Sequence, residues 1–79
     1  MIDSRARERL LWHCRRGMLE LDLLLQKFIA RDFDNLSERE YAALARLLES
    51  SDPELFDYCY GHAQPDDPEL AALVRRIVP

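Results

Sequence analysis

A guanidinium and a carboxylate stand four residues apart in this sequence, with a glycine next to the arginine: Arg16, Gly17 and Glu20. Arg9 and Trp12 precede them at helical spacing, so the side chains share one face if a helix continues to residue 16. Arg and Trp dominate many protein interfaces, and a glycine lets a partner's backbone approach closely. These residues predict a protein-docking patch. An internal role stays open, in which Trp12 packs on the core edge and Arg16 pairs with Glu20 for roughly a few tenths of a kcal/mol.

Two cysteines and two histidines are the candidates for metal or nucleophilic chemistry. Cys59 and His62 are three residues apart, which is an allowed ligand spacing, and His13 directly precedes Cys14. A structural zinc site needs four ligands in recognisable pairs, and the sequence has no CxxC pair. The periodicity points Cys14 inward near the end of a helix, where the helix dipole disfavours a thiolate. We expect two reduced, buried thiols, no bound metal and no catalytic nucleophile.

The size and composition of the chain favour a binding module over an enzyme. With 79 residues the chain has little room for both a core and a deep catalytic cavity. Only two glycines are present, so no glycine-rich loop is available to hold a phosphate. We therefore expect a single small domain over residues 1–79, without catalytic residues and without a cofactor of its own.

The charge pattern argues against nucleic acid as the partner. The net charge is −4, whereas nonspecific nucleic-acid binding needs a basic surface. Five of the 11 basic residues nevertheless lie within the first 16 positions, so we expect an anion-recognising face on an acidic body. No apolar run approaches the roughly 20 residues of a membrane span, and no secretory signal peptide is visible. We expect a cytoplasmic monomer that does not insert into membranes.

Apolar residues recur at helical spacing along the whole chain, and leucine dominates them. The pattern predicts an all-α fold, a compact bundle of five short helices packed around the second. Leu19 and Leu23 are expected to widen the inward face of that second helix. The predicted helices span residues 4–15, 18–31, 37–49, 53–60 and 68–78.

Capping signals mark the ends of these helices. Gly17 is expected in a left-handed backbone just past the first helix. Ser37 and Glu40 have the spacing of a capping box. The segment Asp-Pro-Glu-Leu occurs twice, beginning at Asp52 and at Asp67, and each aspartate is expected to cap the helix that follows.

Residues 14–22 read Cys-Arg-Arg-Gly-Met-Leu-Glu-Leu-Asp, which resembles the RGxxE motif of the SdhE family. Further likeness to this family follows in register: Leu-Ser at 36–37, Asp-Pro-Glu-Leu-Phe at 52–56, Gly-His at 61–62 and Leu-Val-Arg at 73–75. The likeness covers almost the whole chain. Members of the family often have tryptophan where Tyr58 stands here.

The resemblance implies a five-helix bundle that acts as an assembly factor and is not itself a flavin transferase. Such proteins bind the flavoprotein subunit of succinate dehydrogenase, and sometimes that of fumarate reductase, and promote covalent attachment of FAD to it. Whether free FAD also binds stays open. The resemblance assigns partner binding to Arg16, Gly17 and Glu20 of the motif, to the surface residue Arg9, and to the neighbouring Trp12 and Arg15. We expect Arg16→Ala and Glu20→Ala to fold normally and to fail in supporting flavin attachment.

A second class of function stays open beside this one. Relatives in the same family are also described as antitoxin-like proteins that bind a small membrane toxin. The residues offer no direct support for that role, because the sequence shows neither a DNA-binding arm nor a disordered toxin-wrapping tail.

Overall fold

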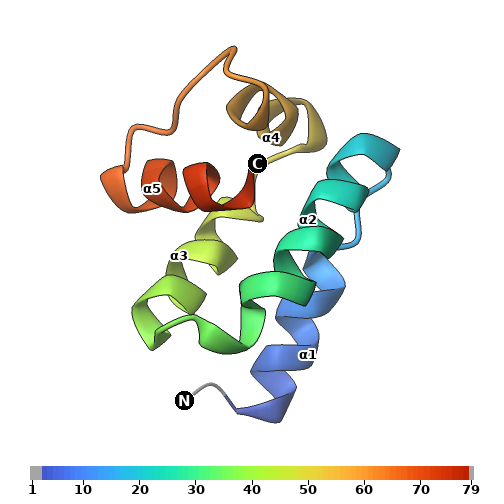
Figure 1. Cartoon of the computed structure of the whole chain (residues 1–79), viewed down its shortest axis with the longest axis vertical. Coiled ribbons are helices and arrows are strands. Elements are labelled where there is room, and N and C mark those ends of the chain that lie inside the picture. Colours follow the sequence, from blue (N-terminus) through green and yellow to red (C-terminus); the bar gives the residue numbers. More distant parts are fainter. Residues whose placement is uncertain (1–2, 79) are drawn as a thin grey trace.

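The computed structural model describes residues 3–78, and these form the five predicted α helices with a short 3-10 helix between the second and the third (Figure 1). Residues 3–78 contain no β strand. The all-α prediction is confirmed. The elements are α1 (Ser4–His13), α2 (Leu19–Asp32), η1 (Phe33–Asn35), α3 (Glu38–Leu47), α4 (Asp52–Cys59) and α5 (Pro68–Ile77).

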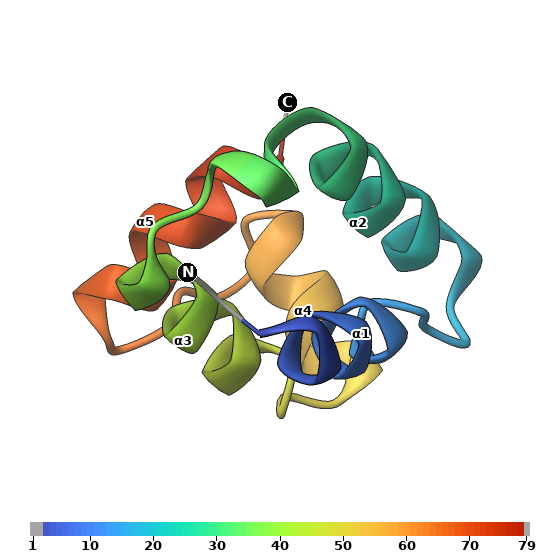
Figure 2. The ribbon, with the colours of Figure 1, turned by 90° about the horizontal axis from the view of Figure 1, so that it is seen from below.

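The first two helices run antiparallel as a hairpin along one side of the molecule (Figure 1). Viewed from below, α1 lies between α2 and α3 (Figure 2). Helix α5 packs against α2, α3 and α4, and its closest packing is with α3. The predicted central position of the second helix is therefore shared with α5.

One hydrophobic core joins all of these elements. Its largest fully buried side chains include Leu21, Leu25 and Phe28 of α2, Phe33 of η1 and Leu44 of α3. Together these side chains bring one face of each helix to a common centre. The expectation that Leu19 and Leu23 widen the inward face is wrong, because both side chains are exposed.

The predicted capping box at the start of α3 is present. The Ser37 hydroxyl accepts from the backbone N–H of Glu40, and the Glu40 carboxylate accepts from the backbone N–H of Ser37. Asp67 caps α5 as predicted, accepting from the backbone N–H of Glu69.

The predicted cap at Asp52 is wrong. Ser51 caps α4 instead and forms a second capping box with Glu54. Asp52 is the first residue inside the helix. A serine directly before the Asp-Pro pair thus takes the capping position and leaves the Asp52 carboxylate available for another contact.

Helix α1 ends at His13, two residues earlier than predicted. The N–H of Arg16, which would bond to Trp12 in a continued helix, donates to the Asp22 carboxylate at 3.2 Å instead. The left-handed backbone expected at Gly17 is absent. Gly61, at the end of α4, is the glycine with a positive φ, 79°, among residues 3–78.

Candidate docking face at the α1–α2 connection

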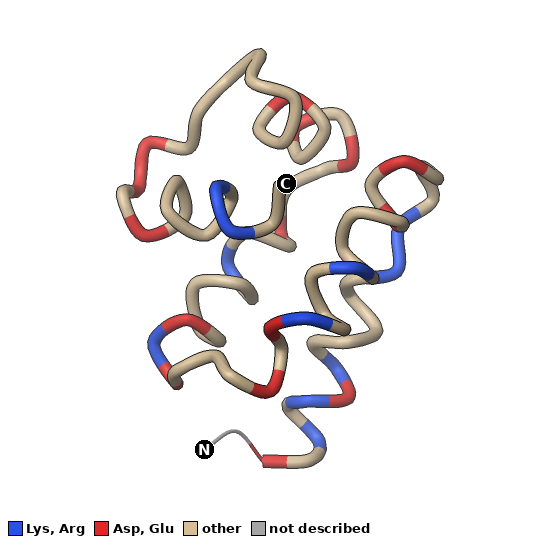
Figure 3. Tube along the Cα trace, in the orientation of Figure 1, with Lys and Arg blue, Asp and Glu red and all other residues tan. Residues whose placement is uncertain are grey.

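Residues 14–18 connect α1 to α2 and carry the centre of the sequence motif. Basic residues in this connection meet acidic residues at the start of α2, as the blue and red segments of Figure 3 show. The guanidinium of Arg16 turns toward the connection between α3 and α4. Its Nε donates to Asp52 Oδ1 at 2.7 Å, and its Nη2 donates to the Ser50 carbonyl at 2.7 Å.

The second terminal nitrogen of Arg16 serves two further carbonyls. Nη1 donates to Leu48 O at 3.1 Å and to His13 O at 3.2 Å. Both oxygens lie at the C-terminal ends of helices, where backbone carbonyls lack partners inside the helix and where positive charge is favoured. The Arg16 side chain is accordingly only 13% exposed.

This placement corrects two expectations about Arg16. It does not share a helix face with Arg9 and Trp12, because the helix has ended, and its ion-pair partner is Asp52 and not Glu20. The physical reason is that Asp52, two helix-end carbonyls and one carbonyl of the α3–α4 connection offer the guanidinium four acceptors at once. Normal folding of Arg16→Ala is therefore no longer expected.

Arg15 behaves differently from its neighbour. Its side chain is 65% exposed, and its Nε lies 3.6 Å from Asp22 Oδ1. The same Asp22 oxygen accepts the backbone N–H of Arg16. Arg15 is therefore free to meet a partner at little structural cost.

Nothing within residues 3–78 requires glycine at position 17. Its φ is not positive, and a Cβ added there would have its nearest contact with Asp52 Oδ2 at 3.6 Å, an ordinary van der Waals distance. Gly17 is also exposed. The absence of a side chain at this position thus matters for what approaches from outside.

Three large apolar side chains are exposed around the connection. Trp12, in the last turn of α1, is 75% exposed; Leu19 and Leu23, in the first turns of α2, are 69% and 53% exposed. Glu20 lies between the two leucines, is exposed, and has no hydrogen-bond or ion-pair partner among residues 3–78. We define the docking face as Trp12, Arg15, Gly17, Leu19, Glu20 and Leu23.

Leu19 and Leu23 lie at the surface, although the apolar pattern predicts them to face the core. At 100° per residue, each lies about 200° around the helix from Leu21, which is fully buried. The two leucines are four residues apart and so share the face opposite the core. The angles around α2, measured from the buried Leu21, therefore predict that both leucines are exposed.

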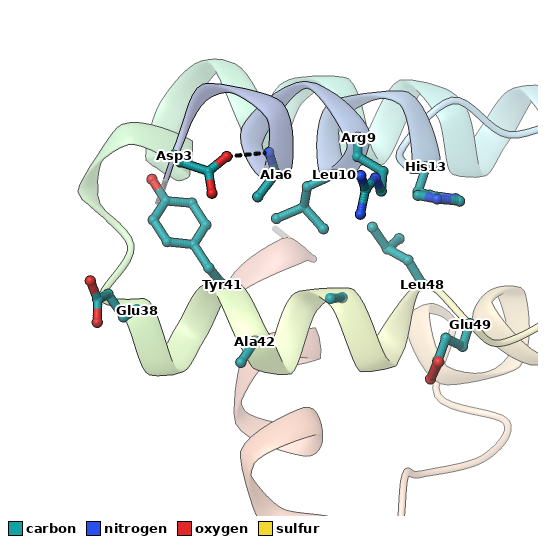
Figure 4. Close-up of a pocket in the computed structure, with 11 residues that line it drawn as sticks. Asp3, Ala6, Arg9, Leu10, His13, Glu38, Tyr41, Ala42, Leu48 and Glu49 are labelled. Carbon is teal, nitrogen blue, oxygen red and sulfur yellow. Dashed lines mark hydrogen bonds between the residues drawn. The ribbon is translucent and has the colours of Figure 1, made fainter. Parts of the chain in front are cut away.

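Arg9 lines a separate groove between α1 and α3, together with Leu10 and His13 (Figure 4). The groove has a volume of about 600 Å³ and a largely apolar floor formed by alanine and leucine side chains. Carboxylates of Asp3, Glu38 and Glu49 lie along its rim. Arg9 is therefore exposed on α1 beside the docking face but also faces this groove.

Neither cysteine is set up for catalysis. Cys14 is completely buried, and burial raises the pKa of its thiol to about 12, against a smaller opposite effect of the Arg16 charge. Burial also raises the pKa of the Cys59 thiol. Within residues 3–78 no group of three or more His, Cys, Asp or Glu side chains is arranged to hold a metal ion.

The structure is that of a small all-α protein with exposed apolar and charged side chains beside a helix connection. None of the helices formed by residues 3–78 has the length and apolar character that crossing a bilayer requires. Comparison with known proteins gives the family. The profile of the family described as the flavinator of succinate dehydrogenase matches residues 8–79, and the chain belongs to that family.

Individual relatives agree with this assignment. The chain is 52% identical over 73 residues to a protein of Legionella pneumophila named FAD assembly factor SdhE, covering 92% of this chain and 91% of the relative. A protein of the same name from Yersinia pseudotuberculosis is 45% identical over 76 residues, with 96% and 84% covered. A solution structure described as a UPF0350 protein is 43% identical, with a TM-score of 0.79 over 98% of this chain and 82% of the other.

Proposed function

We propose that this protein binds the flavoprotein subunit of succinate dehydrogenase through the docking face and promotes covalent attachment of FAD to that subunit. The observation that carries the site is the exposure of Trp12, Leu19 and Leu23 around a connection in which internal bonds hold Arg16. Large apolar side chains on a small domain are costly to leave in water and mark interaction surfaces. Membership of the flavinator family indicates the client.

The protein acts as a helper without catalysing the attachment itself. An assembly factor needs only to bind one conformer of its client more tightly than another, and its effect is limited by that difference in affinity. The client then forms its own bond to the flavin. The complete burial and the high pKa of the Cys14 thiol support a non-catalytic role.

The flavin stays with the client in this proposal. The groove between α1 and α3 is the concave feature lined by Arg9, but three carboxylates on its rim face one guanidinium and one histidine. This balance of charge does not fit a diphosphate, which needs an excess of positive groups. The docking face carries Arg15 as its cation, and one guanidinium does not supply the excess of positive charge that a diphosphate needs.

Three further parts of the proposed function are the oligomeric state of the protein, a second client and the compartment. We propose that it acts as a monomer presenting one docking face, and that the fumarate reductase flavoprotein is a second client. Two free cysteines, one of them fully buried, support a reducing compartment, so we propose the cytoplasm. The family description and the names of the relatives give no support to the antitoxin-like alternative.

The experiment is co-expression with the succinate dehydrogenase flavoprotein subunit of the same organism in a host that lacks its own assembly factor. Covalent flavin is read as fluorescence of the subunit on a denaturing gel. We expect fluorescence that depends on this protein and is lost with Trp12→Ala and with Glu20→Ala. Equal fluorescence with and without the protein would contradict the proposed function.

A matched control separates the docking face from the rest of the surface. Asp66 is an exposed carboxylate in the connection between α4 and α5, and Asp66→Ala removes a charge just as Glu20→Ala does. We expect Asp66→Ala to support full flavin attachment. Equal losses from Asp66→Ala and Glu20→Ala would show that general acidity matters and that the docking face is wrongly placed.

A further inference from the structure

Arg16 is the residue of the motif with the least surface to offer a partner. An arginine has five N–H donors, and four of the hydrogen bonds in this structure come from the Arg16 side chain. With 13% of the side chain exposed, at most one donor is left for a client. Recognition of the client by more than one N–H of this guanidinium would require breaking bonds that hold the protein together.

Those bonds join two parts of the fold that are distant in sequence, residues 13–16 and residues 48–52. The acceptors are the end of α1 at His13, the end of α3 with the following connection, and the first residue of α4, Asp52. On the other side, Asp22 of α2 accepts the backbone N–H of Arg16. Residues 14–18 are thus fixed from α2 by one carboxylate and from α4 by another.

Asp52 is available for this contact because it does not cap its own helix. The capping box of Ser51 and Glu54 satisfies the start of α4. In the second Asp-Pro-Glu-Leu segment the first residue, Asp67, caps α5 with its Oδ1, and its Oδ2 accepts from Arg46. The two segments therefore share a sequence, but Asp52 binds Arg16 whereas Asp67 caps its own helix.

The Asp52 carboxylate also lies directly beside Gly17. One oxygen binds Arg16, and the other is 3.6 Å from the point where a Cβ on Gly17 would stand. The pair thus lies under the part of the docking face that has no side chain.

We propose that Arg16 and Asp52 are positioning residues, which hold the α1–α2 connection so that Trp12, Gly17 and Glu20 keep the placement that the client binds. The proposal rests on the proposed function. It makes Asp52, which no part of the RGxxE pattern includes, a functional residue. It also assigns the effect of Arg16 on assembly to the shape of the docking face and not to contact with the client.

The test is a binding cycle with the purified succinate dehydrogenase flavoprotein subunit. Affinities are measured for the wild type, Arg16→Ala, Asp52→Ala and the double variant, at a temperature where all four are folded by circular dichroism. We expect each single variant to bind at least about tenfold more weakly, and the double variant to bind no worse than Arg16→Ala. Wild-type affinity in Asp52→Ala beside a loss in Arg16→Ala would overturn the proposal, since Arg16 would then contact the client.

A loss of binding through general destabilisation is distinguished by two controls. Arg46→Ala removes the arginine–aspartate pair at the start of α5, whose arginine is more exposed than Arg16, and is expected to bind like the wild type. Amide hydrogen exchange of Arg16, whose N–H is bonded to Asp22, is expected to speed up in Asp52→Ala and to stay unchanged in Arg46→Ala. Equal losses of binding in these two variants would overturn a positioning role. If Asp52→Ala does not fold, Asp52→Asn replaces it, because the amide oxygen still accepts from Nε without the charge.

Glu20→Ala separates this inference from the proposed function. If Glu20→Ala loses client binding while Asp52→Ala keeps it, the docking face stands and the positioning role is wrong. If the wild type does not bind the flavoprotein subunit, both are wrong.

Discussion

At the scale of single residues, Arg15 and Arg16 are adjacent in sequence and opposite in role. Arg16 is enclosed by acceptors, whereas Arg15 is exposed and makes one long ion pair. We expect Arg16→Ala to lower the free energy of unfolding by about 2–4 kcal/mol, because it leaves the Asp52 carboxylate and several helix-end carbonyls unpaired. Arg15→Ala should change it by less than about 0.5 kcal/mol. Urea unfolding followed by circular dichroism measures both, and similar values for the two would contradict the described contacts.

Substitutions at Gly17 distinguish a role of this glycine in folding from a role in binding the client. A Cβ fits at this position and the backbone is not left-handed, so Gly17→Ala should alter stability by less than about 1 kcal/mol. The larger Gly17→Leu should fold as well, because the residue is exposed. We expect both to weaken client binding, the leucine more strongly, since the added atoms keep the client's backbone away. The measurement is thermal unfolding together with client binding; unfolding of Gly17→Ala would show that the glycine serves the fold.

At the scale of the helices, the capping residues make stability depend on pH. Hydrogen bonds from the backbone of Ser37 and Ser51 lower the pKa of Glu40 and Glu54, and that from Glu69 lowers the pKa of Asp67. A carboxyl with a lowered pKa in the folded state stabilises the fold above its unfolded pKa, near 4, and this contribution is lost as the pH falls further. We expect the melting temperature to fall below about pH 4.5 and to vary little from there to neutral pH.

Glu54→Gln isolates one of these groups. The glutamine oxygen can still accept from the backbone of Ser51, so the capping box stays while the titration disappears. We expect a shallower decline of the melting temperature between about pH 4.5 and 3 than in the wild type. Asp66→Asn serves as the control, because Asp66 is exposed and caps no helix. Identical acid profiles for Glu54→Gln and the wild type would contradict the effect of the cap.

The helices themselves could be predicted from the sequence, and the contacts between their ends could not. Periodicity located all five helices, because burial of one face per helix is a local pattern in the sequence. The early end of α1 and the partner of Arg16 depend on Asp22 and Asp52, the second of which is 36 residues away. Competition among several acceptors for one guanidinium is decided by the packing of α3 and α4, which no local pattern encodes. The exposure of Leu19 could have been predicted from the sequence, because spacing alone gives its angle around α2 relative to the buried Leu21.

At the scale of the whole molecule, the core is apolar and the ion pairs lie around it. Residues 3–78 have no buried charged side chain, and the cross-links between distant segments are arginine–carboxylate pairs at the surface or partly below it. Such pairs contribute most where they are shielded from water, as at Arg16. The same bonds that stabilise the fold therefore also shape the docking face, and the two effects must be measured separately.

The buried thiol gives a prediction for the molecule as a whole. Because burial raises the pKa of Cys14 to about 12, the folded protein holds a proton there that the unfolded chain releases near pH 9. The unfolded state binds fewer protons between these values. The contribution of the protonated thiol to the free energy of unfolding should therefore be complete below about pH 9 and should be lost as the pH rises toward 12.

In native protein, a thiol reagent should modify the half-buried Cys59 first and reach Cys14 only at the rate of unfolding. Two equally fast thiols in the native state would show that the α1 end of the core opens readily and that Cys14 is not held as described.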